Sequence, residues 1–409
     1  MYKLSTTIAL ISLLLLCGCP PPASKSGNTG NTTSQTQQGS NQATPARGQQ
    51  QVVAMVASDL GIGDGVRVRE LDGLLANLGE TQDIGYTLYG TLPQQIEFGE
   101  IDGEVGMPDP ESKLPGKMTD LQAAALLDQV QSCDWLVLSS GYLLKSALER
   151  IDNGSLKAKA VIVVDEIGSD GVINITSVPV FRLRFDICPA AFMAGAAAAR
   201  SSNVAHFMLL GSADDPQVAE FMDAAVAGLE YVSPSAWVKQ AVLPVDSRGM
   251  VAPETFRDEH IRLLNEAGAN YNGNHYILDL TRSTPYVTAL IADPQGPLNG
   301  YVSGGYEDLR HVAEKRILTF GVKKGDVALA WLLKNCATVA DLQAAADPNG
   351  YIMFGLKGSR PGLDESAVGY TSLEFYERYN PDGPDIAAEL ETIWRELEAG
   401  ELGVDYCDH

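Results

Sequence analysis

Short β-branched runs alternate with helical stretches along most of this chain of 409 residues. Strands that alternate with helices of about 10–15 residues predict parallel sheets joined by right-handed crossovers. The segment from residue 51 onward is long enough for two such sheets, so the sequence predicts an α/β fold with two Rossmann-like lobes. The expected strands are residues 52–57, 134–140, 159–166, 204–211, 236–243, 275–280, 299–305 and 316–322.

The N-terminal segment, residues 1–18, has the features of a signal peptide. Lys3 precedes an apolar run, Ile8 to Leu16, that is too short to span a bilayer as a helix of about 20 residues. Leu16-Cys17-Gly18-Cys19 resembles the lipobox of bacterial lipoproteins. This resemblance implies that palmitate-type acyl chains on Cys19 anchor an extracytoplasmic protein to the cell membrane or outer membrane. An ordinary secretory signal, cut within residues 20–23, is the alternative.

Residues 19–50 combine the expected lipidated cysteine with a polar tract whose only charges are Lys25 and Arg47. Such a tract cannot bury enough apolar surface to offset its conformational entropy. We therefore expect a disordered tether between the membrane and a globular body.

Charge and composition narrow the partners of that body. The net charge of −23 argues against nucleic acid and anionic membrane surfaces. No cysteine or histidine spacing indicates a metal site, and no cofactor motif is present. The acidity is mostly a solubility property and says little about the ligand.

Four cysteines lie beyond Cys19: Cys133, Cys188, Cys336 and Cys407. An even number in an oxidising compartment permits two disulfides with three possible pairings. We expect Cys336 to pair with Cys407, since both lie late in the chain. For Cys133 and Cys188, free buried thiols are an equally reasonable interpretation.

Three glycines, Gly61, Gly63 and Gly65, follow the first expected strand. They do not fit a dinucleotide fingerprint, because the third glycine comes too soon, and no Gly-Lys-Ser/Thr completes a phosphate-binding loop. The sequence also lacks a G-x-S-x-G elbow and an H-E-x-x-H motif. Loops beyond the carboxyl ends of strands bind ligands in open α/β sheets, so these features indicate a binding protein, not an enzyme.

Eight segments of the body carry a resemblance to a known family: VAMVASDLGIGD, LVLSSGYLLKSALERI, VIVVDE, AFMAGAAAA, VAHFMLLGSADDPQVAEFMDAAVAGLEYVSP, ILTFGV, YIMFGLKGS and IWRELEAGEL. The body resembles the basic membrane protein (BMP) family, the PnrA-like substrate-binding lipoproteins of bacterial ABC importers, several of which bind purine nucleosides. The resemblance implies a type I periplasmic-binding-protein architecture with a ligand cleft between the lobes, a permease as membrane partner and a monomeric state.

The departures from the family pattern fall where the ligand would lie. Arg67 stands where the family has a phenylalanine that stacks on the base, and Lys323 stands where an acid often contacts ribose hydroxyls. Asp59 and Asp165 remain at their matching positions. Base stacking contributes about 1–3 kcal/mol, so we expect weak nucleoside binding and a small polar ligand, which could carry an anionic group. In the alternative interpretation, Arg67 and Lys323 point to solvent or pair with nearby acids.

The expected ligand-binding residues lie in loops after strands of both lobes. They are Asp59, Gly61, Asp64, Arg67, Gly141, Tyr142, Asp165, Ser303, Gly304, Tyr306 and Lys323.

The expected domain boundaries place lobe 1 at residues 51–178 with a return segment near 325–356. Lobe 2 takes residues 179–324 and the C-terminal segment near 357–409, and about three crossings join the lobes. Residues 90–118 are predicted to be an acidic surface insertion relative to the family pattern. The predicted function is solute capture for an ABC importer; a sensor or scaffold of the same fold is the main alternative, and a periplasmic hydrolase is the third.

Overall fold

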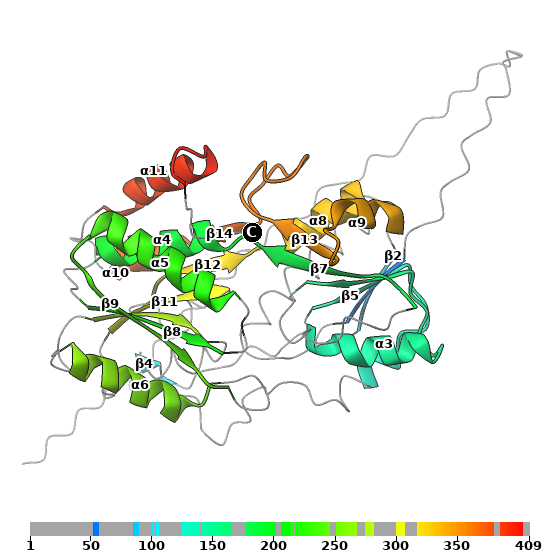
Figure 1. Ribbon diagram of the computed structural model, residues 1–409, viewed down its shortest axis with the longest axis horizontal. Coiled ribbons are helices and arrows are strands. Elements are labelled where there is room, and N and C mark those ends of the chain that lie inside the picture. The colour runs from blue at the N-terminus through cyan, green and yellow to red at the C-terminus, as the bar shows by residue number, and fades with distance from the viewer. Residues whose placement is uncertain are drawn as a thin grey trace, which may run out of the picture. The chain divides into compact units, whose positions relative to one another are not determined.

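A computed structural model provides the fold, and its described residues lie within Gln49–His409 (Figure 1). Within the described part, no helix is long and apolar enough to cross a membrane. The structure describes residues 52–56, 85–89, 100–101, 104–105, 125–139, 141–164, 177–201, 206–213, 215, 217–245, 251–267, 275–281, 300–306, 317–379 and 385–403.

The first sheet is entirely parallel and has six strands in the order β13-β7-β6-β5-β1-β2. The central strands β5 and β6 are buried along their whole length. Continuous apolar runs are typical of parallel strands whose two faces are both covered. The strands are β1 (Val52–Val56), β2 (Gly85–Tyr89), β5 (Trp135–Leu138), β6 (Ala160–Val163), β7 (Val180–Phe185) and β13 (Tyr351–Phe354).

The second sheet also has six strands, in the order β14-β12-β11-β10-β8-β9. Its pairs are parallel except at one edge, where β14 runs antiparallel to β12. Two parallel α/β sheets confirm the predicted fold class. The strands are β8 (His206–Ser212), β9 (Trp237–Leu243), β10 (His275–Leu280), β11 (Gly300–Tyr306), β12 (Ile317–Lys323) and β14 (Val368–Tyr370).

The chain passes between the two sheets three times in the described segments. It leaves the first sheet after β7 and enters α4 (Cys188–Ser201), which precedes β8. It returns from β12 through α8 (Gly325–Asn335) and α9 (Val339–Ala345) to β13, and then crosses back to β14. The predicted boundary at residues 178/179 is wrong, because β7 pairs with β6 and β13 in the first sheet.

Helix α4 packs tightly against α5 (Val218–Val232), which follows β8. The contact depends on two glycines: a Cβ on Gly195 would lie 2.0 Å from the carbonyl oxygen of Ala225, and a Cβ on Gly228 would lie 2.0 Å from that of Phe192. The small-residue run in α4 therefore permits backbone-to-backbone contact between two helices.

The remaining described helices complete the layers. α6 (Pro253–Glu266) packs on β8 and β9, and α11 (Ala387–Glu398) packs on α4. α3 (Leu144–Asp152) follows β5, and α10 (Glu374–Tyr379) contacts β12. Within the predicted insertion, β3 (Glu100–Ile101) pairs with β4 (Glu104–Val105) in an antiparallel hairpin.

The cysteines differ from the expected pairing. Cys336 is a buried free thiol, as is Cys133, so the predicted Cys336–Cys407 disulfide is wrong. Cys188 at the start of α4 is disulfide-bonded instead. Proximity in sequence suggested Cys336, but its side chain packs within the hydrophobic core. Cys407 and Cys19 lie outside the described residues.

Candidate functional site

The carboxyl ends of β8, β10, β11 and β12 lie along one edge of the second sheet, because these strands run parallel. In open α/β sheets this edge is where ligands bind. Three polar side chains of this edge, Ser212, Asp279 and Thr281, are fully buried, each with 0% exposure. We call these three residues the strand-edge site.

Asp279 is the central residue of the strand-edge site. Its Oδ1 accepts hydrogen bonds from the backbone N–H of Thr281 at 2.8 Å and from the Thr281 hydroxyl at 2.7 Å. Its Oδ2 has no hydrogen-bond partner in the described part of the chain. Burial raises the pKa of Asp279 to about 7, and the two hydrogen bonds from Thr281 oppose that rise.

Ser212 lies at the end of the neighbouring strand, and its Oγ also lacks a hydrogen-bond partner among the described residues. Asp279 pairs with Leu210 in the parallel register, and Ser212 is two residues further on. Side chains two residues apart in a strand point to the same face, so Ser212 and Asp279 share one face of the sheet. On the other side of Asp279 the register partner is Gly304, which has no side chain.

An unsatisfied buried polar group costs about 1–3 kcal/mol. Two such atoms on one face of a ligand-binding edge are therefore an arrangement that a bound molecule would stabilise. The Oδ2 of Asp279 can accept a hydrogen bond, and the hydroxyl of Ser212 can donate or accept one. A ligand with hydroxyl or N–H donors matches this pair.

A second buried polar group lies at the end of β12, on the face covered by α4 and α5. Lys323 is only 8% exposed, and its Nζ donates to Oε1 of Gln217 at 3.1 Å. Nε2 of Gln217 donates to the carbonyl of Phe185 at 2.8 Å, and its backbone N–H donates to Oδ1 of Asp215 at 2.8 Å. The alternative in which Lys323 points to solvent is therefore wrong.

The network of Lys323 and Gln217 also connects the two sheets. Phe185 ends β7 of the first sheet, while Gln217 precedes α5 of the second. Gln217 thus joins the first crossing to the end of β12. This position fixes the lysine ammonium close to the segments that link the sheets.

The structure places several predicted ligand residues at strand ends. Gly141 and Tyr142 lie in a 3-10 turn, Gly141–Leu143, directly after β5. Ser303, Gly304 and Tyr306 lie in the second half of β11, and Tyr306 pairs with Val322, beside Lys323. The remaining predicted residues, Asp59, Gly61, Asp64, Arg67 and Asp165, lie outside the described residues.

The predicted ligand-binding residues did not include Ser212, Gln217, Asp279 and Thr281. Asp279 had a visible signal, since an acid ends the apolar run HYILDL much as Asp165 ends VIVVDE. No sequence pattern indicated Gln217, because its role depends on partners from β7 and β12 that are distant in sequence. Within the described segments, no group of three or more potential ligands could hold a metal ion.

The chain is similar in fold to solved solute-binding proteins of ABC transporters. An ABC transporter solute-binding protein from Conexibacter woesei is 12% identical, with a TM-score of 0.50, and the match covers 88% of this chain and 100% of that chain. A second, from Aeropyrum pernix, is 13% identical, with a TM-score of 0.50 and coverage of 88% and 94%. The sequence matches no known family and no curated protein. These similarities show that the chain shares the fold of these two structures.

Proposed function

We propose that this chain is an extracytoplasmic solute-binding lipoprotein of an ABC importer, which captures a small polar ligand at the strand-edge site. The observation that carries this proposal is a pair of fully buried atoms, Oδ2 of Asp279 and Oγ of Ser212, that have no hydrogen-bond partner among the described residues. Their position at the carboxyl edge of a parallel sheet matches the general location of ligand sites in such folds.

The chemistry of the pair favours a ligand that donates hydrogen bonds. A neutral polyol, a sugar or the ribose of a nucleoside has hydroxyls that can donate hydrogen bonds to Asp279. Membership of the BMP/PnrA-like family belongs to this proposal, and so do ligand roles for Asp59, Asp165 and Arg67. Lys323 faces α5 and not the face that carries Asp279, so we assign it first to the link with Gln217.

The remaining parts of the proposal concern the membrane. A lipid on Cys19 would hold the body near a permease, and residues 20–50 would act as the tether. One acyl chain gives only marginal membrane binding, so two or three chains are expected. Nothing in the proposal requires catalysis by the chain itself.

Calorimetric titration of the purified full-length protein tests the function. The panel comprises purine nucleosides, neutral sugars and sugar acids, and Asp279→Asn is titrated beside the wild type. Asn retains an oxygen for Thr281 but replaces the acceptor Oδ2 with a donor, so we expect at least roughly tenfold weaker binding, equivalent to about 1.4 kcal/mol.

The matched control is Asp258→Asn, which removes the same charge from the surface of α6, where the Asp258 side chain is 73% exposed. It should bind as the wild type does. Equal affinities for Asp279→Asn and wild type would contradict the assignment of the site, and catalytic turnover of a nucleoside or ester would contradict the function.

A further inference from the structure

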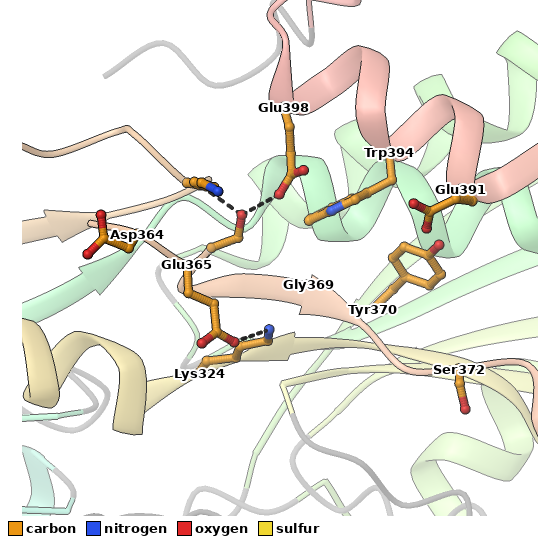
Figure 2. Close-up of a pocket in the computed structure, with 11 residues that line it drawn as sticks. Lys324, Asp364, Glu365, Gly369, Tyr370, Ser372, Glu391, Trp394 and Glu398 are labelled. Carbon is orange, nitrogen blue, oxygen red and sulfur yellow. Dashed lines mark hydrogen bonds and ion pairs between the residues drawn. The ribbon is translucent and has the colours of Figure 1, made fainter. Parts of the chain in front are cut away.

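A cavity of about 510 Å³ lies between α11 and the segment that connects β13 to β14, in a part of the fold that the proposed function does not use (Figure 2). Its volume is in the range of small-molecule pockets. We call it the α11 pocket. Its lining includes Lys324, Ser366, Tyr370, Glu391, Trp394 and Glu398.

The α11 wall of this pocket alternates carboxylate and aromatic groups. Glu391, Trp394 and Glu398 are three and seven residues apart, which places them on one face of the helix. Figure 2 shows the indole of Trp394 between the two carboxylates, with the Tyr370 hydroxyl directed toward Glu391. The Trp394 and Tyr370 rings meet edge-on, with centroids 5.5 Å apart.

The charges of the lining are unequal, with four carboxylates and two lysines. Lys324 is already engaged, because its Nζ lies 3.2 Å from Oε1 of Glu365. Among the described residues, the one ion pair of Glu391 is an exposed pair with Arg395, in which Nε and Oε1 lie 3.5 Å apart. Exposed pairs contribute little to stability. Glu398 has no cationic partner within 4.0 Å in the described part of the chain.

Glu398 is nevertheless held in position. Its Oε1 accepts a hydrogen bond from the hydroxyl of Ser366 at 2.7 Å, and Ser366 Oγ in turn accepts the backbone N–H of Lys357 at 2.7 Å. Ser366 itself is buried. The carboxylate is therefore oriented at the pocket wall with its other oxygen available to a ligand.

Tyr370 remains an uncharged aromatic group beside these carboxylates. Burial, with a further contribution from the charge of Glu391, raises the pKa of Tyr370 to about 12. The pocket therefore offers aromatic rings and carboxylates together. This combination attracts organic cations through cation–π contact and charge pairing.

The α11 pocket is separate from the strand-edge site. Tyr370 pairs with Gly321, and a Cβ on Gly321 would contact α4 and α5, so Tyr370 lies on that face of the second sheet. The strand-edge site occupies the opposite face, because Leu209 and Leu278 belong to the core cluster of α4 and α5, whereas Leu210, the register partner of Asp279, does not.

We propose that the α11 pocket binds a small organic cation bearing a primary ammonium group, which Glu398 and Glu391 pair with and the ring of Trp394 contacts. Two walls of the pocket are connecting segments between the sheets, since Lys324 follows β12 and Ser366 precedes β14. The occupant therefore touches two of the three crossings, whatever ligand the strand-edge site takes.

Calorimetric titration of the full-length protein with 1,4-diaminobutane tests this site, and 1,4-butanediol serves as the uncharged probe of the same length. The wild type should bind the diamine saturably and the diol at least roughly tenfold more weakly. Glu398→Gln and Trp394→Leu should each weaken diamine binding roughly tenfold or more. Glu401→Gln, an equal charge change at an exposed position outside the pocket, should bind like the wild type.

Several results would overturn the proposal. They are absence of diamine binding to the wild type up to about 10 mM, equal binding of the diol, or binding unchanged in both Glu398→Gln and Trp394→Leu. Diamine binding that is lost in Asp279→Asn but kept in Glu398→Gln would assign the cation to the strand-edge site instead. Circular dichroism of each variant confirms that a lost signal does not reflect unfolding.

Discussion

At the scale of single residues, the main feature of the strand-edge site is the buried carboxyl group of Asp279. Asp279 is a fully buried carboxyl group, and in the described segments only its Oδ1 accepts hydrogen bonds. Burial disfavours the charged form of such a group, so its pKa in the folded state lies above the ordinary value. The burial of Asp279 therefore makes the stability of the folded state depend on pH.

Asp279 should make the folded state less stable as the pH rises. Its pKa is about 7 when folded, against an ordinary value of 3.8, so the folded state binds more protons than the unfolded state between these values. The contribution is favourable below about pH 4 and is lost as pH rises toward about 7, with a magnitude of up to about 4 kcal/mol.

Urea denaturation of wild type and Asp279→Asn across this pH range measures the effect. The free energy of unfolding of the wild type should fall relative to that of the variant as the pH rises. Asp258→Asn, which alters an exposed carboxyl group, should show no such trend. A difference that stays constant with pH would contradict the buried, unpartnered state of Asp279.

The cysteines give a second prediction at this scale, namely that Cys188 pairs with Cys407. Cys133 and Cys336 are free thiols, and Cys17 and Cys19 belong to the expected signal and lipid site. α11 begins beside the end of α4, where Arg200 contacts Glu389 at 2.5 Å. The end of α11 is connected to the start of α4 through neighbouring residues. Ser366 donates a hydrogen bond to Glu398, the N–H of the next residue, Ala367, donates to Gly355, and the N–H of Asp186, two residues before Cys188, donates to Phe354.

Peptide mapping by mass spectrometry under non-reducing, denaturing conditions tests this pairing. We expect a linked peptide pair containing Cys188 and Cys407, with free thiols at Cys133 and Cys336. In the folded protein these thiols should react slowly, because burial raises the pKa of Cys133 to about 12 and also raises that of Cys336. A peptide linking Cys336 to Cys407, or four free thiols, would contradict the prediction.

At the scale of elements, much of the fold could be predicted from the sequence. Strands such as β5 and β6 are apolar runs buried on both faces, and such runs are visible without any tertiary information. The boundary after β7 could not be found in this way, because the segment from Phe185 to Cys188 has no change in composition. Asp279 could have been predicted as a site residue, because an acid follows an apolar run there. The role of Gln217 could not, because it depends on contacts with β7 and β12 that are distant in sequence.

The contact between α4 and α5 yields a prediction whose sign is informative. Helix propensity alone predicts that Gly195→Ala stabilises the protein by about 1 kcal/mol. The Cβ would instead lie 2.0 Å from the Ala225 carbonyl oxygen, so the helices must separate. We expect destabilisation of about 1–3 kcal/mol, which thermal unfolding would measure. A more stable Gly195→Ala variant would contradict the close approach of the two helices.

At the scale of the whole molecule, two mainly parallel sheets are joined by three crossings, in a fold similar to that of two solved solute-binding proteins. Each crossing comes from a different part of the chain, and the described polar contacts of Gln217, Lys324 and Ser366 lie on or beside these crossings. The strand-edge site and the α11 pocket lie on opposite faces of the second sheet. A ligand in the α11 pocket would therefore contact two of these crossings, at Lys324 and Ser366.

Native mass spectrometry of the full-length protein, after incubation with a small-molecule cell extract and removal of unbound material, tests the central claim most directly. The wild type should carry a small polar molecule that Asp279→Asn lacks, because the variant replaces the Oδ2 acceptor with a donor at a buried position. Asp258→Asn should carry the same molecule as the wild type. Equal occupancy in wild type and Asp279→Asn, or an empty wild type, would contradict solute capture at the strand-edge site.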